Sequence, residues 1–188
     1  GALQANSTAA NNTAVGTEAM AGTTTGTQNS AFGKAAMITN TEGDFNTALG
    51  AYALKLATTA DNNTAVGWEA LVANTTGAQN AAIGRKALRA CTTGSYNSAI
   101  GDNALYTTTT GSLNIGLGRE SVASSATVSG EAIIGDSNVD TLRCNTQTIS
   151  ALSDERDKTE IIDLPYGLDF INQTRPVQFK WESRKGNI

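Results

Sequence analysis

Apolar and polar positions along the chain follow a pattern that repeats every seventeen residues. Each copy carries a short phrase in which a small residue, a large apolar residue and a glycine follow one another, as in Ala14-Val15-Gly16. The large apolar position, here called the Φ column, comprises Val15, Phe32, Leu49, Val66, Ile83, Ile100, Leu117 and Ile134. Because this position is apolar in every copy, we expect the Φ column to face a core.

A second apolar position follows five residues after the Φ column. This leucine column comprises Met20, Met37, Leu54, Leu71, Leu88, Leu105, Val122 and Val139. The alternation of Ala, Φ and Gly is typical of a very short strand, and the run is too brief for an ordinary helix. Seventeen residues with two turn signals therefore predict two short strands and two bends, which make one coil of a β-solenoid.

The fold class that follows is an all-β solenoid of about eight coils. Parallel coils stacked about 4.8 Å apart would form a rod of roughly 40 Å. We assign residues 1–139 to this rod, residues 140–152 to a connecting strand, and residues 153–188 to a short α+β segment in which charge density rises sharply. The content of Leu, Ile, Val and Phe is low, 35 of 188 residues, which predicts a narrow core in each chain.

An asparagine column precedes the short strands. It comprises Asn12, Asn29, Asn46, Asn63, Asn80, Asn97 and Asn114. Asn tolerates the left-handed region and bonds to neighbouring amides, so a structural ladder of side chains is the favoured interpretation. Direct binding of a ligand is the alternative.

A threonine column is also complete. It comprises Thr24, Thr41, Thr58, Thr75, Thr92 and Thr109. The favoured interpretation is a hydroxyl ladder at a bend, and the alternative is an ice-binding face. Adjacent threonines on a strand point to opposite faces, which argues against a flat ice-binding file.

Large aromatic side chains occupy variable positions of the repeat. Tyr52, Trp68 and Tyr96 are candidate receptor contacts, and Phe45 shares their character. Exposed aromatic residues dock sugars or partner proteins, whereas packing between chains would explain them equally well. Both interpretations stay open.

Composition excludes several classes of chemistry. The chain has no histidine and a net charge of −4, so it lacks imidazole bases, imidazole ligands and a basic stripe for nucleic acid. Cys91 and Cys144 are 53 residues apart, too far for a metal-binding motif, and are interpreted as unpaired thiols. The carboxylates do not line up as a glycosidase pair or a calcium ladder. We therefore expect no cofactor, no metal, no membrane insertion and no enzyme activity in the rod.

The C-terminal segment carries a candidate nucleophile and base. Ser153 and Lys158 are five residues apart, with Asp154 and Arg156 between them as supporting residues. Without histidine, a lysine is the base available to a serine, and it must be desolvated to lose its proton. Attack by Ser153 on the preceding carbonyl would cleave the chain between Leu152 and Ser153. The alternative is that Ser153 and Asp154 cap a helix.

The phrase Asn-Thr-Ala-Val-Gly-x-x-Ala-Leu resembles the repeats of trimeric autotransporter adhesin heads and of phage tail fibre shafts. The resemblance covers about residues 10–139. It implies a left-handed β-roll, three parallel chains around one axis with apolar columns at the centre, and attachment to a host surface. The coils here are longer than those common in adhesin heads.

The tail resembles the C-terminal intramolecular chaperone of phage tailspikes and endosialidases. The matching positions are Ser153, Asp154, Arg156, Lys158, Ile161, Leu168, Ile171, Pro176, Val177, Phe179 and Trp181. The resemblance implies assisted trimerisation followed by self-cleavage before Ser153. Asp157 departs from the family pattern, which has an apolar residue there, and with 36 residues after Leu152 we expect a truncated chaperone.

These observations together predict a homotrimeric tail fibre or tailspike of a virion that binds a host receptor, either a glycan or an outer-surface protein. The rod is expected to be stable only as a trimer. A bacterial trimeric surface adhesin is the alternative with the same fold, and an ice-binding solenoid is the alternative from another class.

Overall fold

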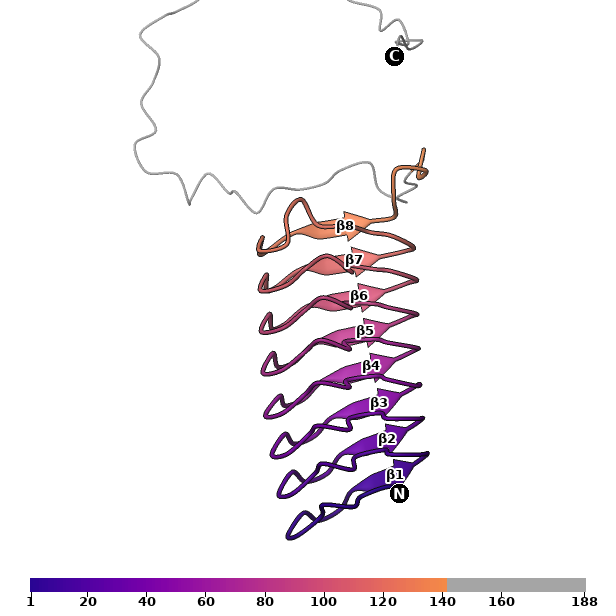
Figure 1. Ribbon diagram of the computed structural model, residues 1–188. Helices are drawn as coiled ribbons and strands as arrows, with labels where there is room; N and C mark the ends of the chain where they lie inside the picture. Colours follow the sequence, from indigo (N-terminus) through magenta and orange to yellow (C-terminus); the bar gives the residue numbers. More distant parts are fainter. Residues whose placement is uncertain (142–188) are drawn as a thin grey trace, which may run out of the picture. The chain divides into compact units, whose positions relative to one another are not determined.

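The computed structural model describes residues 1–141, which form a single stack of coils (Figure 1). Each coil contributes one strand to an eight-stranded parallel sheet whose order follows the chain. The strands are β1 (Thr13–Val15), β2 (Ser30–Phe32), β3 (Thr47–Leu49), β4 (Thr64–Val66), β5 (Ala81–Ile83), β6 (Ser98–Ile100), β7 (Ile115–Leu117) and β8 (Ala132–Ile134). The predicted all-β solenoid is therefore confirmed.

The register of the sheet equals the period of the sequence. Each strand residue pairs with the residue seventeen positions later, as Ala48 does with Ala65 and Leu49 with Val66. Equivalent side chains therefore stack along the rod. Before β1, Leu3 donates its N–H to the carbonyl of Ala19 (3.1 Å), so the first residues continue the same stack.

The expectation of two strands per coil is wrong, since each coil contains one strand of three residues and otherwise turns and bends. In most coils three non-glycine positions have positive φ, for example Phe45, Tyr52 and Leu54 in the coil around β3. Left-handed residues at such short spacing break the extended backbone that a second strand needs.

The core of the rod is built from the small residues that precede the Φ residues, from the leucine column, and from the alanine that precedes each residue of the leucine column from Met20 to Leu105. In β3 the central Ala48 is buried and the flanking Thr47 and Leu49 are exposed. The leucine column is buried completely from Met20 to Leu105. Small alanines on one wall and long side chains on the other fill a narrow interior, as the low apolar content predicts.

The Φ column does not face this core, contrary to expectation. Its side chains lie on the outer face of the sheet, and all except Val66 are between 38% and 55% exposed. The cause is the alternation of side chains along a strand, because an inward alanine directs both neighbours outward.

The leucine column also explains where the regular repeat ends. From Met20 to Leu105 these residues adopt φ of about 50°, which a side chain unbranched at Cβ tolerates. The next two positions are Val122 and Val139, whose β-branched side chains make positive φ costly. Neither has positive φ, and both are exposed.

Among residues 1–141 there is no helix long and apolar enough to cross a membrane.

Candidate functional site

The asparagine column forms a continuous hydrogen-bonded ladder at one corner of the rod. The N–H of Asn63 donates to Oδ1 of Asn46 (2.9 Å), and Nδ2 of Asn63 donates to the carbonyl of Gly77 (2.9 Å). The same pair of bonds recurs for Asn80, with Asn63 and Gly94 as acceptors. Because these side chains from Asn29 onward are buried, their polar groups serve the backbone of the neighbouring coils.

The residue with positive φ at this corner is the one before each asparagine. It is Asn62 before Asn63 and Tyr96 before Asn97. The asparagine itself is therefore held by side-chain hydrogen bonds, and its tolerance of the left-handed region is not used.

The threonine column directs its hydroxyls along the rod. Oγ1 of Thr58 donates to the carbonyl of Thr75 (3.2 Å), and Thr75 donates in turn to Thr92 (3.1 Å). Each hydroxyl proton of this column is thus committed to the next coil. The threonine column is therefore a ladder that supports the backbone. Its hydroxyl groups have no proton left to donate to water molecules of an ice surface.

A further column of side-chain acceptors was not recognised in the sequence. Oδ1 of Asp61 accepts from the N–H of Asp44 (2.7 Å), and Oδ1 of Asp44 accepts from the N–H of Thr27 (2.6 Å). Three coils later Oγ of Ser112 accepts from the N–H of Ser95 (3.0 Å). Asp and Ser are alternative acceptors for one backbone amide, so the column has no constant residue type that a sequence pattern would reveal.

The three aromatic candidates do not form one surface. Tyr52 and Trp68 lie on the turn that follows the strand in successive coils, where N–H of Tyr52 donates to the carbonyl of Lys34 and N–H of Lys86 donates to that of Trp68 (both 2.9 Å). Tyr96 stands next to the asparagine column at a different corner. The exposed ring of Tyr96 is therefore not part of the surface that carries Tyr52 and Trp68.

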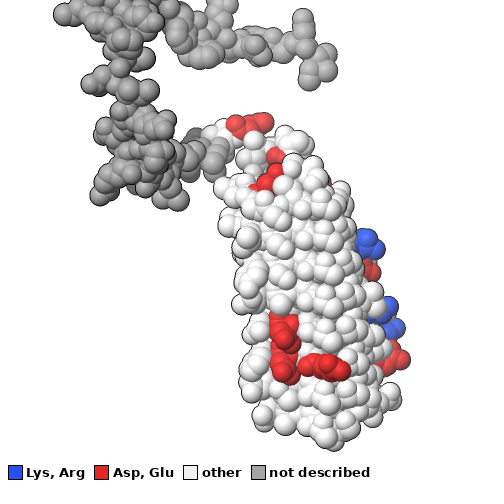
Figure 2. Space-filling model, turned by 90° about the vertical axis from the view of Figure 1, so that its left-hand side faces the viewer, with Lys and Arg blue, Asp and Glu red and all other residues white. Residues whose placement is uncertain are grey.

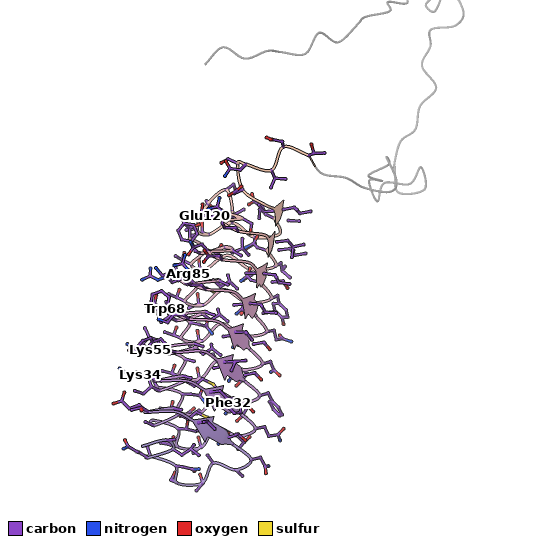
Figure 3. All side chains as sticks on the ribbon, turned by 90° about the vertical axis from the view of Figure 1, so that its right-hand side faces the viewer. Phe32, Lys34, Lys55, Trp68, Arg85 and Glu120 are labelled. Carbon is purple, nitrogen blue, oxygen red and sulfur yellow. The ribbon has the colours of Figure 1, made fainter. Side chains whose placement is uncertain are left out.

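Lysine side chains accompany Tyr52 and Trp68. Nζ of Lys34 and Nζ of Lys55 lie 5.8 and 5.5 Å from the centroid of the Tyr52 ring, and Nζ of Lys86 lies 5.0 Å from that of Trp68. These distances are within the range of cation–π attraction. Figure 3 shows Lys34, Lys55, Trp68 and Arg85 along one edge of the rod, with Phe32 on the side of the strands.

Four ion pairs are present among residues 1–141. Arg85 pairs with Asp102 (2.9 Å), Arg89 with Glu69 (3.1 Å), and Arg119 with both Asp136 (2.6 Å) and Glu120 (3.6 Å). The arginines are about half exposed, so each pair contributes little to stability.

Two acidic residues near the C-terminal end of the rod, Glu131 and Asp136, have carboxyl groups whose pKa is lowered. Glu131 stands at the next position of the asparagine column, and its N–H still donates to Oδ1 of Asn114 (2.9 Å). Hydrogen bonds from the hydroxyl and the N–H of Ser124 lower the pKa of the Glu131 carboxyl. The pKa of Asp136 is also lowered, first by the N–H and side chain of Asn138 and then by Arg119.

Cys91 has a free thiol that is buried in the interior of the rod. Burial raises its pKa from 9.0 to about 11, against a smaller lowering by a backbone hydrogen bond of Gly94. One and three coils earlier, Asn74 and Asn40 occupy the same position and donate to Gly77 and Gly43 (2.9 and 3.0 Å). The thiol therefore replaces a structural amide in a protected place and is not a reactive centre.

The predicted cleavage site lies outside the described residues. This applies to Leu152, Ser153, Asp154, Arg156 and Lys158. Within the rod, no three acidic or cysteine side chains are grouped so that they could hold a metal ion.

Comparison with known proteins gives a match for the tail and none for the rod. Residues 153–188 match the family described as the chaperone of endosialidase. Neither a curated protein nor a solved structure matches the chain. The match supports the predicted chaperone-like tail, and the likeness of the repeats to adhesin heads stays a prediction.

Proposed function

We propose that this protein is a trimeric fibre of the phage tail type, in which a β-solenoid rod attaches the particle to a host surface. The observation that carries the proposal is the match of residues 153–188 to the chaperone of endosialidase. It follows, in the same chain, a rod that leaves an apolar column uncovered along its whole length. A chaperone segment of this kind implies a trimeric assembly.

The Φ column is the face that we assign to the trimer axis. Its eight side chains stack in register from Val15 to Ile134, so three copies would present three continuous apolar stripes to one another. Covering the exposed half of one such side chain contributes roughly 1 kcal/mol. The contribution repeats at every coil, which suits a long rod with a narrow core of its own.

The tail would act once, after assembly. In the proposed reaction Oγ of Ser153 attacks the carbonyl carbon of Leu152 while neutral Lys158 accepts the hydroxyl proton. The C–N bond breaks, the amine of Ser153 takes up a proton, and an ester between Leu152 and Ser153 remains. Water then hydrolyses this ester and releases a carboxylate on Leu152. Asp154 and Arg156 would position the serine and lysine.

Two measurements on the full chain test this proposal. Sedimentation velocity should give the mass of three chains. Intact mass under denaturing conditions should show a fragment ending at Leu152 in the parent, and no such fragment in Ser153→Ala or Lys158→Ala. Lys158→Arg is the matched variant that keeps the charge but cannot supply a neutral base, so it should also remain uncut.

The outcomes separate the two parts of the proposal. A folded monomer at micromolar concentration would overturn the trimeric fibre. An uncut trimeric parent would remove the self-cleavage and leave the fibre. Among alternatives with the same rod, a bacterial surface adhesin would share the trimer, and the chaperone match favours the tail fibre of a virion over it.

A further inference from the structure

All positive side chains of the rod lie along one edge. Among residues 1–141 there are six Lys and Arg residues, and every one comes from the turn after the strand. They form what we call the basic edge, which comprises Lys34, Lys55, Arg85, Lys86, Arg89 and Arg119. Figure 2 shows the blue side chains confined to one border of the visible face, and Figure 3 shows the labelled members in one row.

The basic edge has charge that is not neutralised by its neighbours. The arginines take part in the ion pairs with Glu69, Asp102, Glu120 and Asp136. None of the four ion pairs within residues 1–141 includes a lysine. The Nζ atoms of Lys34 and Lys55 instead lie over the Tyr52 ring, and Nζ of Lys86 lies over the Trp68 ring.

An aromatic ring beside an ammonium group has two complementary surfaces for a ligand. The ring presents an apolar face on which the C–H face of a pyranose can stack, and Trp68 is 41% exposed. The ammonium group donates charge-assisted hydrogen bonds to a carboxylate. A sugar that carries a carboxylate on its ring satisfies both groups at once.

We infer that the basic edge binds a carboxylated polysaccharide, with Tyr52 and Trp68 as stacking platforms and Lys34, Lys55 and Lys86 as partners of its carboxylates. This inference rests on the proposed attachment function and specifies the chemistry of the receptor. The three lysines extend over three coil spacings, or roughly 14 Å along the rod. A linear chain lying parallel to the rod would meet one platform after another.

The edge remains available in the proposed trimer. In Figure 3 it lies on the side of the rod away from the strands that carry the Φ column. Nucleic acid fits the edge less well, because the carboxylates of Glu69 and Asp102 stand among the cations and would repel closely spaced phosphates.

The test is binding of the full-length protein to immobilised polygalacturonate, alginate and hyaluronan, with methyl-esterified polygalacturonate as the uncharged counterpart. At least one acidic polymer should bind, and the ester should bind much more weakly. Each variant introduces the residue that another coil has at the same position of the repeat, so that it adds no new backbone strain. Lys55→Val copies Val72, Lys86→Asn copies Asn103, and Trp68→Ala copies Ala51.

Each lysine variant should weaken binding about tenfold, the equivalent of one charge-assisted hydrogen bond, and Trp68→Ala several-fold. Two controls match these changes away from the edge. Thr59→Glu copies Glu42 and lowers net charge by one, as Lys55→Val does, and Tyr96→Asn copies Asn62 and removes an exposed ring. Both should bind like the parent.

The inference is overturned if none of the three acidic polymers binds, if the ester binds equally well, or if Thr59→Glu weakens binding as much as Lys55→Val. Binding to an acidic protein or to DNA with none to the polysaccharides would also overturn it. A trimer without polysaccharide binding removes this inference alone, whereas a monomer that binds through the edge removes the proposed fibre.

Discussion

The N–H of Asn80 donates a hydrogen bond to Oδ1 of Asn63, which lies one coil earlier (3.0 Å). Asn63 in turn donates from Nδ2 to the carbonyl of Gly77 (2.9 Å). The Asn63 side chain thus links its own corner to the following coil, through Oδ1 to the N–H of Asn80 and through Nδ2 to the carbonyl of Gly77. Repeated along the rod, this link holds successive corners at a constant separation where no strand pairing exists.

Replacing Asn63 by Ala should lower stability markedly. The change leaves the N–H of Asn80 buried without its acceptor and removes one of two side-chain hydrogen bonds to the carbonyl of Gly77, which keeps the bond from Nδ2 of Asn74, at a cost of about 3 kcal/mol in all. The thermal midpoint followed by circular dichroism should fall by roughly 10 °C. Thr64→Ala is the control, because Thr64 is exposed and Ala81 occupies the same position. Equal midpoints for the two variants would contradict a stabilising ladder.

Gly67→Ala should disrupt the stack at the turn after β4. Gly67 has φ 130°, and a Cβ there would lie 2.5 Å from the carbonyl oxygen of Gly84 in the next coil. Gly130 is the matched control, since it has φ 80° but no neighbouring atom within 4 Å of the place that a Cβ would take. Gly130→Ala should lose about 1–2 kcal/mol from φ alone, and Gly67→Ala clearly more. A similar loss in urea unfolding for both would show that coil contact is not the cause.

Charge on the Φ column should disrupt the trimer, and the rod should unfold with it, because the rod is expected to be stable only as a trimer. Leu49→Glu and Ile100→Glu place carboxylates on the outer face of β3 and β6, where three copies would bring like charges together. Sedimentation velocity should show loss of the three-chain species, and circular dichroism should show loss of the β spectrum. Phe45→Asn removes an equally exposed apolar side chain at another corner and should stay trimeric. Trimers that survive both Glu variants would exclude this face.

Cys91 should be unreactive in the folded protein and should make stability fall at high pH. Its folded pKa is about 11 and its ordinary value is 9.0. At pH 8 the thiolate fraction is then roughly a hundredfold lower than in the unfolded chain. Because the pKa of Cys91 is higher in the folded protein, the contribution of its thiol to the free energy of unfolding is complete below pH 9. This contribution is lost as the pH rises towards 11.

The measurement is the rate of reaction with a thiol reagent in a Cys144→Ser background, with and without denaturant. Cys91→Asn, which copies Asn40 and Asn74, should remove this part of the pH dependence between 9 and 11. Rapid labelling of the native protein would contradict the burial of Cys91.

The basic edge was not predicted from the sequence. Its members occupy three different positions of the repeat, and no single position is basic in every coil. They converge because left-handed residues such as Tyr52 and Leu54 fold the turn tightly. The sequence singled out Tyr52, Trp68 and Tyr96 together, whereas the fold separates Tyr96 from the other two.

The sequence by itself determined the length of the coil, the parallel stacking and the register, because identical residues at a constant spacing satisfy one another best when they lie in line. Only the tertiary structure decided which apolar column is inside. Alternation along a strand places Ala48 and Leu49 on opposite faces but does not say which face is enclosed. The turns after each strand decide this, because they return the chain to the alanine side and leave the larger side chains outside.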